Sequence, residues 1–208
     1  MKKLRILGFN HDTLVDQTVY NNEDGSINTY AGISFEYVDY ITTATNMYNT
    51  SNQSDVSGGW GNRTLRNTLN NSLYSTVSGI IGENTIMQVI KLYGTSASIK
   101  TLISQSQDYL WLLSVSEIGG SGANYQEGSQ YKYYQNYGVT YSAIDKQDNI
   151  YTKKPANVVN TNAEGTPWWT RSLCYTGAYG FDTVGSYGRL SSANSSSAFP
   201  NVAPGFSI

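Results

Sequence analysis

The composition of the C-terminal third restricts the fold more than any other feature of the sequence. Between residues 175 and 201 almost every residue is Gly, Ser, Ala, Asn or an aromatic residue. Glycines interrupt the run that carries Phe181, Val184, Tyr187 and Leu190. Glycine weakens helices, and this spacing is typical of short strands joined by tight turns. The segment therefore predicts strands that present their side chains one by one.

Strand patterns also occur upstream. Apolar residues in 4–9 and the alternation in 33–38 predict two strands. The apolar run 86–92 has helical and strand features and favours a strand because Gly94 follows it. Residues 109–113, Tyr-Leu-Trp-Leu-Leu, form the most apolar stretch and predict a strand that is buried on both faces.

Three segments predict helices. Leu65, Leu69 and Leu73 recur on one helical face, and Asn62 is available as the N-cap. Ser114 and Glu117 have the spacing of a capping box. Residues 127–137 carry two tyrosines at helical spacing. Because helices and strands are segregated rather than alternating, we predict an α+β fold with one domain over residues 1–208.

Charge and hydrophobicity argue against a nucleic-acid-binding protein and against a protein that spans a membrane. Charged residues make up 13% of the chain and the net charge is −2, so the basic surface that binds nucleic acid is missing. No run approaches the roughly 18 apolar residues of a membrane-spanning helix. The apolar stretch after Met1–Arg5 is too short for a signal peptide. We therefore expect synthesis in a cytoplasm without a signal peptide, which is compatible with assembly into a virion or onto a cell surface.

Several sequence blocks resemble a known family. The motif Trp168–Trp169–Thr170–Arg171–Ser172 and the closing residues 202–208 are similar to an uncharacterised domain family of phage structural proteins and Firmicutes surface proteins. That family reads Trp-Trp-Leu-Arg-Ser and ends near Val-Arg-Pro-Ala-Phe, so Thr170, Ala203 and Gly205 depart from its pattern. The upstream blocks follow the family's order: Leu7–Gly8–Phe9–Asn10–His11–Asp12, Gly58–Gly59–Trp60 with Leu65–Arg66, Leu112–Leu113–Ser114 and Glu127–Gly128–Ser129–Gln130–Tyr131.

The resemblance implies a fold similar to C-type-lectin-like domains, which include the formylglycine-generating enzymes. Such a fold has a small, mostly antiparallel sheet, one or two helices and long loops. Its terminal strands usually pair, which would place Leu4–Phe9 beside Val202–Ile208. Some members are variable receptor-binding proteins of phages, which retroelements diversify within a C-terminal segment whose composition is similar to that of residues 175–201.

Few residues suggest catalysis. His11 is the only histidine, and Asp12 beside it would point to the opposite face of a strand, so a structural role for His11 is favoured. Cys174 is the only cysteine, whereas the formylglycine-generating enzymes depend on a pair. Carboxylate pairs for glycoside hydrolysis occur in any chain with 15 acidic residues. We therefore predict that the protein is not an enzyme, and keep a hydrolase or a relative of the formylglycine generators as an unsupported alternative.

A cofactor is not predicted either. Calcium is the open alternative, because Asp12, Asp16, Glu23 and Asp24 supply carboxylate oxygens in one polar segment, although their spacing matches no EF-hand.

The leading hypothesis is recognition of a ligand or receptor through residues 175–201. Tyr, Ser, Gly and Asn dominate binding loops because tyrosine covers area with few rotatable bonds. The predicted contact residues are Tyr175, Tyr179, Phe181, Asp182, Tyr187, Arg189, Asn194 and Phe199. The predicted supporting residues are Trp168 and Trp169 on opposite faces of one strand, Arg171 binding several carbonyls, and Trp60 as a loop anchor or part of the binding rim.

The expected partner is a host-surface protein or glycan, or another virion protein. A structural decoration protein of a phage particle, assembled as a homo-oligomer, is the alternative that fits the low charge equally well.

Overall fold

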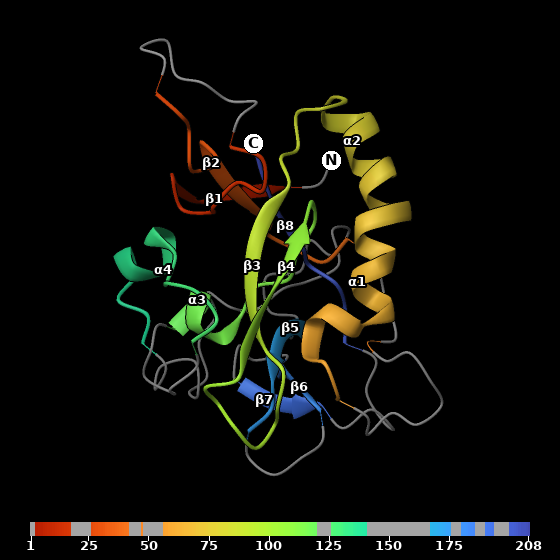
Figure 1. The fold of residues 1–208 in the computed structure, drawn as a ribbon, viewed down its shortest axis with the longest axis vertical. Coiled ribbons are helices and arrows are strands. Elements are labelled where there is room, and N and C mark those ends of the chain that lie inside the picture. Colours follow the sequence, from red (N-terminus) through yellow and green to blue (C-terminus); the bar gives the residue numbers. More distant parts are fainter. Residues whose placement is uncertain are drawn as a thin grey trace, which may run out of the picture.

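The structure is a computed structural model that describes residues 3–17, 26–41, 47, 56–119, 126–140, 167–175, 180–185, 190–193 and 200–208. In this part of the chain, small antiparallel sheets and short helices make a mixed α+β architecture (Figure 1). None of the described helices is long and apolar enough to cross a membrane. The α+β prediction is confirmed at this level.

The first sheet joins both ends of the chain. Its strands are β1 (Leu4–Phe9), β2 (Ile33–Tyr37) and β8 (Gly205–Ser207), in the order β1-β2-β8. Both pairings are antiparallel, with Ile6 opposite Phe35 and Phe35 opposite Phe206. The terminal strands therefore share a sheet, but the expectation that they pair directly is wrong. The β2 strand lies between them because its two edges bond β1 and β8.

The second sheet is a hairpin of β3 (Val89–Gly94) and β4 (Ile103–Asp108). It runs through the middle of the molecule (Figure 1). The long helical segment lies on one side of the hairpin, and α3 (Val115–Gly119) and α4 (Lys132–Asn136) lie on the other side. The predicted strand in residues 86–92 is thus confirmed. The predicted helix in 127–137 is shorter than expected, because Gly128 has a φ of 108°, which a helix cannot contain.

The long helical segment follows a 3₁₀ turn, η1 (Gly59–Asn62). It comprises α1 (Thr64–Thr68), a π-helical turn η2 (Leu69–Leu73) and α2 (Tyr74–Ile81). Leu65 and Leu69 are buried and Leu73 packs against the same core, as the periodicity predicts. The N-cap is Arg63 rather than the predicted Asn62, because Asn62 closes the 3₁₀ turn.

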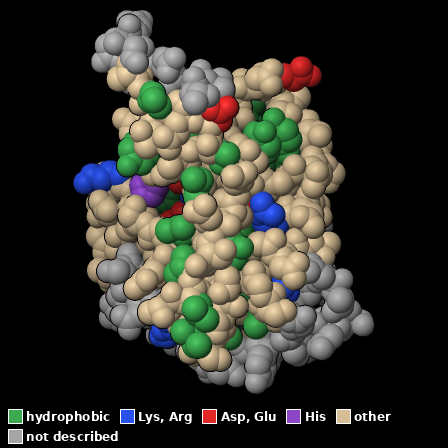
Figure 2. All heavy atoms as spheres, in the orientation of Figure 1, with side chains coloured by type: hydrophobic (Ala, Val, Ile, Leu, Met, Phe, Trp, Pro, Cys, Tyr) green, Lys and Arg blue, Asp and Glu red, His purple; other side chains and the backbone are tan. Residues whose placement is uncertain are grey.

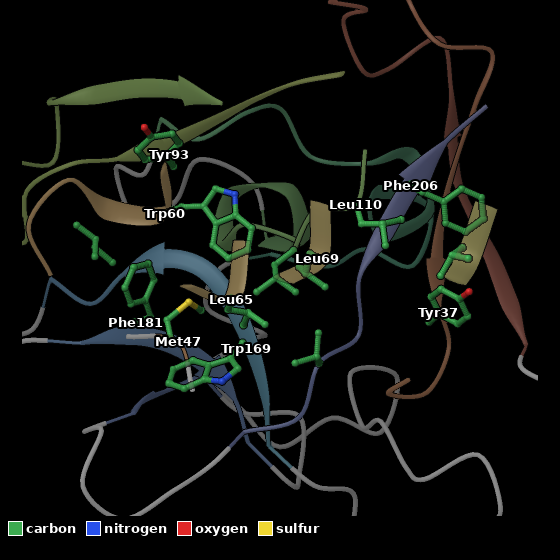
Figure 3. Packing of buried hydrophobic residues seen from close by; sticks show 14 of the residues in the cluster. Tyr37, Met47, Trp60, Leu65, Leu69, Tyr93, Leu110, Trp169, Phe181 and Phe206 are labelled. Carbon is green, nitrogen blue, oxygen red and sulfur yellow. The ribbon is translucent and has the colours of Figure 1, made fainter. Parts of the chain in front are cut away.

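The third sheet contains β5 (Trp168–Leu173), β6 (Phe181–Val184) and β7 (Leu190–Ala193) in sequence order. These are the short antiparallel strands that the C-terminal composition predicts. Every residue of β5 is buried. Trp169 packs in one core cluster and Trp168 in the other, so the two rings face opposite sides of the strand as expected. Figure 3 shows the Trp169 cluster extending from Phe181 and Trp60 to Tyr37 and Phe206.

The predicted strand at residues 109–113 is wrong, although its burial is confirmed. Leu110, Trp111, Leu112 and Leu113 are fully buried, but only an isolated bridge between Trp111 and Gly205 has strand geometry.

Side chains replace the missing ladder of hydrogen bonds. The Asn70 carboxamide accepts from the backbone N–H of Tyr109 at 2.6 Å and donates to the carbonyl of Leu110 at 3.0 Å. Arg171 donates to the carbonyl of Leu112 through Nη1 and to that of Leu113 through its backbone N–H. Buried backbone groups need partners, and here side chains and isolated backbone bonds to β5 and β8 supply them in place of a continuous ladder.

Candidate functional site

A buried lysine is at the centre of the strongest polar cluster in the described structure. Lys91 lies on β3 between the buried residues Val89 and Tyr93, so its side chain points inward with theirs. Its Nζ lies 2.8 Å from Asp12 Oδ1, 2.6 Å from Glu117 Oε1 and 2.9 Å from the Tyr131 hydroxyl. These three partners use the three N–H donors of an ammonium group.

The Lys91 ammonium also lies over an aromatic ring, 3.8 Å from the ring centroid of Trp111. A desolvated cation in this position gains from the negative face of the indole. Lys91 therefore has no donor left for a further ligand.

Asp12 is held as a carboxylate. Its oxygens accept hydrogen bonds from Lys91, from the Tyr131 hydroxyl, and from Ser34 at 2.5 Å and Ser207 at 3.0 Å. Burial opposes its ionisation, but the attraction of Lys91 and the bonds from Lys91 and Ser34 outweigh burial and lower the pKa of Asp12 to about 2. Asp12, in the segment between β1 and β2, thereby joins β2, the end of β8 and β3.

Arg171 of β5 anchors the opposite end of the cluster. Its guanidinium donates to the carbonyls of Leu92 at 2.8 Å, Leu112 at 2.5 Å and Glu127 at 2.8 Å. Nη1 also lies 2.6 Å from Glu117 Oε2. The prediction that Arg171 binds several carbonyls is confirmed. These carbonyls precede β5 in the sequence, so the described bonds fix earlier segments rather than the loop after the motif.

Glu117 connects the two cations. Its backbone N–H donates to Ser114 Oγ at 3.1 Å, and its Oε2 accepts from the Ser114 N–H at 3.0 Å. This is the predicted capping box. Burial opposes ionisation of Glu117, but Arg171 and Lys91 lower its pKa nonetheless. Two carboxylates and two cations thus balance in the interior.

Glu127 differs from the other buried acids. It accepts from the Gly94 N–H at 2.8 Å and from the Ser172 hydroxyl. Burial raises its pKa despite the opposing hydrogen bond from Ser172 and the charge of Arg171. Its environment therefore favours the neutral form more than those of Asp12 and Glu117 do.

An open pocket of about 600 Å³ lies above this cluster. Its floor includes Asp12, Lys91 and Glu117, and its remaining lining residues carry no charged groups when His11 is neutral: Asn10, His11, Thr13, Tyr30, Ile90, Leu92, Gln105, Gly128 and Ser129. Figure 2 shows the only histidine of the chain (purple) beside acidic side-chain atoms (red) in a hollow of this face. The volume lies within the range of about 300–1,000 Å³ typical of small-molecule sites.

His11 ends a stack of three rings. Its imidazole stacks on Tyr131 with 3.9 Å between centroids, and Tyr131 stacks on Trp111 at 5.8 Å. Burial lowers the pKa of His11, and the nearby Asp12 and Glu117 oppose this effect only in part. The imidazole is therefore neutral at pH 7. Ser129 Oγ lies 3.5 Å from its Nε2.

The predicted contact residues are not gathered at this pocket. Tyr175 is half-buried at the end of β5, and the ammonium of Lys100 lies 5.4 Å from its ring centroid. Phe181 and Asp182 are buried in β6, the middle strand of its sheet, which does not fit their predicted role as ligand contacts. Five further predicted contacts lie outside the described residues: Tyr179, Tyr187, Arg189, Asn194 and Phe199.

Trp60 is a loop anchor. Its ring is fully buried and its Nε1 donates to Asp108 Oδ2 at 2.9 Å. Arg66 also binds Asp108, 2.7 Å away. Trp60 therefore does not form a binding rim. Cys174 is buried as well, which does not fit a solvent-accessible nucleophile.

The described residues contain no group of three or more His, Cys, Asp or Glu side chains that could hold a metal ion. Asp12 of the proposed calcium segment binds Lys91 instead, while Glu23 and Asp24 lie outside the described residues.

Lys91, Glu127 and Tyr131 were not predicted from the sequence as members of one cluster. One signal was available for Lys91: a charged residue at an inward position of an apolar strand requires a buried partner. Its partners come from distant segments, Asp12 and Glu117, which only the fold brings together.

Comparisons with known proteins identify the family. No match was found among curated proteins or among solved structures. The family described as "Domain of unknown function (DUF6273)" matches residues 18–208, which include most of the pocket lining and the whole Trp-Trp-x-Arg-Ser motif. The chain therefore belongs to the DUF6273 family.

Proposed function

We propose that this protein is a non-enzymatic recognition module whose ligand binds in the open pocket above Lys91. One observation carries the proposal. The ionic groups of the floor form ion pairs with neighbouring buried residues, and the rim around them has neutral hydrogen-bonding groups. A floor of this kind is rigid, because each ion needs its partners to remain buried. A rigid, concave and polar surface suits binding with little conformational cost.

The protonation states of the floor argue against acid–base catalysis. Asp12 and Glu117 have lowered pKa values, and the pKa of Tyr131 is raised by burial and by the neighbouring Asp12. A general acid or base works best with a pKa near the working pH. These three groups are instead locked in one protonation state.

A serine hydrolase is the second candidate, because Ser129 Oγ lies near Nε2 of His11 inside the pocket. A triad also requires a carboxylate on the other ring nitrogen. No carboxylate in the described part of the chain accepts a hydrogen bond from His11. Labelling by a fluorophosphonate probe separates the two candidates: we expect no labelling, and labelling that Ser129→Ala abolishes would overturn the non-enzymatic proposal.

The proposed function includes a C-type-lectin-like fold and a location on a phage particle or a cell surface. A C-type-lectin-like fold on a phage particle or cell surface is supported by terminal strands that share one sheet and by the Trp-Trp-x-Arg-Ser motif of β5. Residues 175–201 would supply a second recognition surface, which includes the half-buried Tyr175 beside Lys100 of the β3–β4 connection.

An NMR screen tests whether the pocket binds ligands. Amide and side-chain signals of the protein would be followed while a library of small polar fragments is added. We expect at least one class of fragment to shift signals of His11, Gln105 and Ser129 together. If no fragment perturbs the pocket while others bind elsewhere, the pocket is not the ligand site.

A further inference from the structure

We infer that the pocket above Lys91 binds a neutral saccharide. This inference rests on the proposed function, since it names the ligand class of the same pocket.

The floor offers no free charge to a charged ligand. Among the described residues that line the pocket, Lys91 is the only cation, and its three donors are directed to Asp12, Glu117 and Tyr131. A phosphate or carboxylate ligand would need a cation with free donors. An ammonium ligand would have to compete with Lys91 for the same two carboxylates. A ligand without net charge avoids both costs.

The rim offers groups that donate and accept. Asn10 and Gln105 carry carboxamides, and Thr13, Tyr30 and Ser129 carry hydroxyls. Asn10, Gln105, Tyr30 and Ser129 are exposed, so their groups reach a ligand without rearrangement of the core. Each sugar hydroxyl is itself a donor and an acceptor, and a carboxamide satisfies both functions of such a group.

A flat ring completes the site. One face of the His11 imidazole is covered by Tyr131, and the residue lines the pocket while remaining only half-buried. An aromatic platform packs against the apolar C–H face of a sugar ring, while hydroxyls at the sugar's edge bond the rim. Tyr30, also at the rim, offers a second ring. Neutral hydroxyl-binding groups around flat rings favour a saccharide over an aliphatic ligand, which would leave the polar groups unpaired.

The test is NMR titration of the whole chain with a sugar panel. The neutral probes are glucose, galactose, mannose and N-acetylglucosamine. The charged probes are glucose 6-phosphate, glucosamine and N-acetylneuraminic acid. We expect at least one neutral sugar to shift the signals of His11, Gln105 and Ser129, and to bind more tightly than its charged counterparts.

Variants locate the binding. His11→Ala removes the platform and Gln105→Ala removes an exposed carboxamide, and we expect each to weaken binding by about tenfold, the effect of one good contact. Tyr137→Ala is the matched control, because Tyr137 is an exposed aromatic residue outside the pocket lining. This variant should bind the neutral sugar as tightly as the unchanged protein does. Since Gln105 lies exposed on β4, its variant is expected to fold even if His11→Ala does not.

The outcomes separate the inference from the proposed function. Pocket shifts caused only by charged probes, or by polar fragments but by none of the neutral sugars, would overturn the saccharide inference and leave the pocket a ligand site. Neutral sugars that bind with undiminished affinity to both pocket variants would also overturn it. If neither sugars nor fragments perturb the pocket, the proposed function itself fails.

Discussion

At the scale of single residues, Lys91 shows how one buried charge organises its surroundings. Its ammonium is bonded by two carboxylates from distant parts of the chain and lies over Trp111. Replacing a whole buried ionic cluster by apolar residues is often harmless, whereas removal of one member leaves the others uncompensated. Lys91 therefore matters because Asp12 and Glu117 remain when it is lost.

We expect Lys91→Met to lower the free energy of unfolding by about 3–5 kcal/mol, because two buried carboxylates lose their common cation. Urea denaturation followed by tryptophan fluorescence measures the change. Lys132→Met is the control: Lys132 is exposed on α4, and its replacement should change stability by less than about 0.5 kcal/mol. A similar, small effect of both substitutions would show that the Lys91 cluster does not stabilise the fold.

At the scale of elements, the helical segment does more than cover the core. The π-helical turn places Asn70 against the backbone of residues 109–110, and its carboxamide takes the role of a neighbouring strand. π-helical turns often occur where a helix must present a particular side chain. Here the wider turn explains why an apolar stretch is buried without joining a sheet.

Asn70→Ala should destabilise the protein by about 1–3 kcal/mol, because the N–H of Tyr109 and the carbonyl of Leu110 lose their partner. Asn71→Ala is the matched control. Asn71 is exposed and bonds only a carbonyl of its own helix among the described contacts, so its loss should be within about 0.5 kcal/mol. Thermal denaturation of both variants measures the difference, and equal melting temperatures would contradict the role given to Asn70.

Substitution of two glycines by alanine should change the stability of the protein in opposite directions. A Cβ on Gly205 of β8 would overlap the ring of Trp111, so Gly205→Ala should cost about 1–3 kcal/mol. A Cβ on Gly79 of α2 meets no atom within 4 Å beyond the backbone of its own helix, so Gly79→Ala should stabilise the helix by about 0.5–1 kcal/mol. Chemical denaturation of both variants tests the close contact of β8 with Trp111, and a neutral Gly205→Ala would refute it.

At the scale of the whole molecule, the buried carboxyl groups around Lys91 make stability depend on pH. The folded pKa of Asp12, about 2, lies below its ordinary value of 3.8, and that of Glu117 is also lowered from 4.5. Both groups therefore stabilise the fold at a pH above their ordinary pKa values. This stability is lost as the pH falls through their pKa values in the folded state. Glu127 acts in the opposite sense, because its pKa is raised.

We expect the free energy of unfolding of the native protein to fall steeply between about pH 4.5 and pH 2, where the unfolded chain takes up protons before the folded one. Asp12→Asn should lower stability at pH 7 and reduce this slope. Glu83→Gln is a control because Glu83 is exposed just after α2. Denaturation at several pH values measures both slopes, and an unchanged slope in Asp12→Asn would contradict the assignment.

Much of the architecture was readable from local patterns. The apolar residues in 4–9, the alternation in 33–38, the leucines at 65 and 69, the Ser114–Glu117 capping box and the short strands after Trp168 all agree with the structure. Such features depend on neighbours in the sequence, whose spacing directly sets which face is buried. The carbonyl-binding role of Arg171 also followed from its chemistry.

The tertiary structure decided the features that depend on distant contacts. Residues 109–113 carry the apolar pattern of a strand, but the side chains of Asn70 and Arg171 bind much of their backbone, so only the bridge from Trp111 to β8 forms. Strand β2 separates the two terminal strands, and Phe181 lies in the core. The pocket depends on Asp12, Lys91 and Glu117 meeting across the fold. Sequence patterns determine which residues must be buried, whereas the partner of each buried polar group is set by which segments meet in three dimensions.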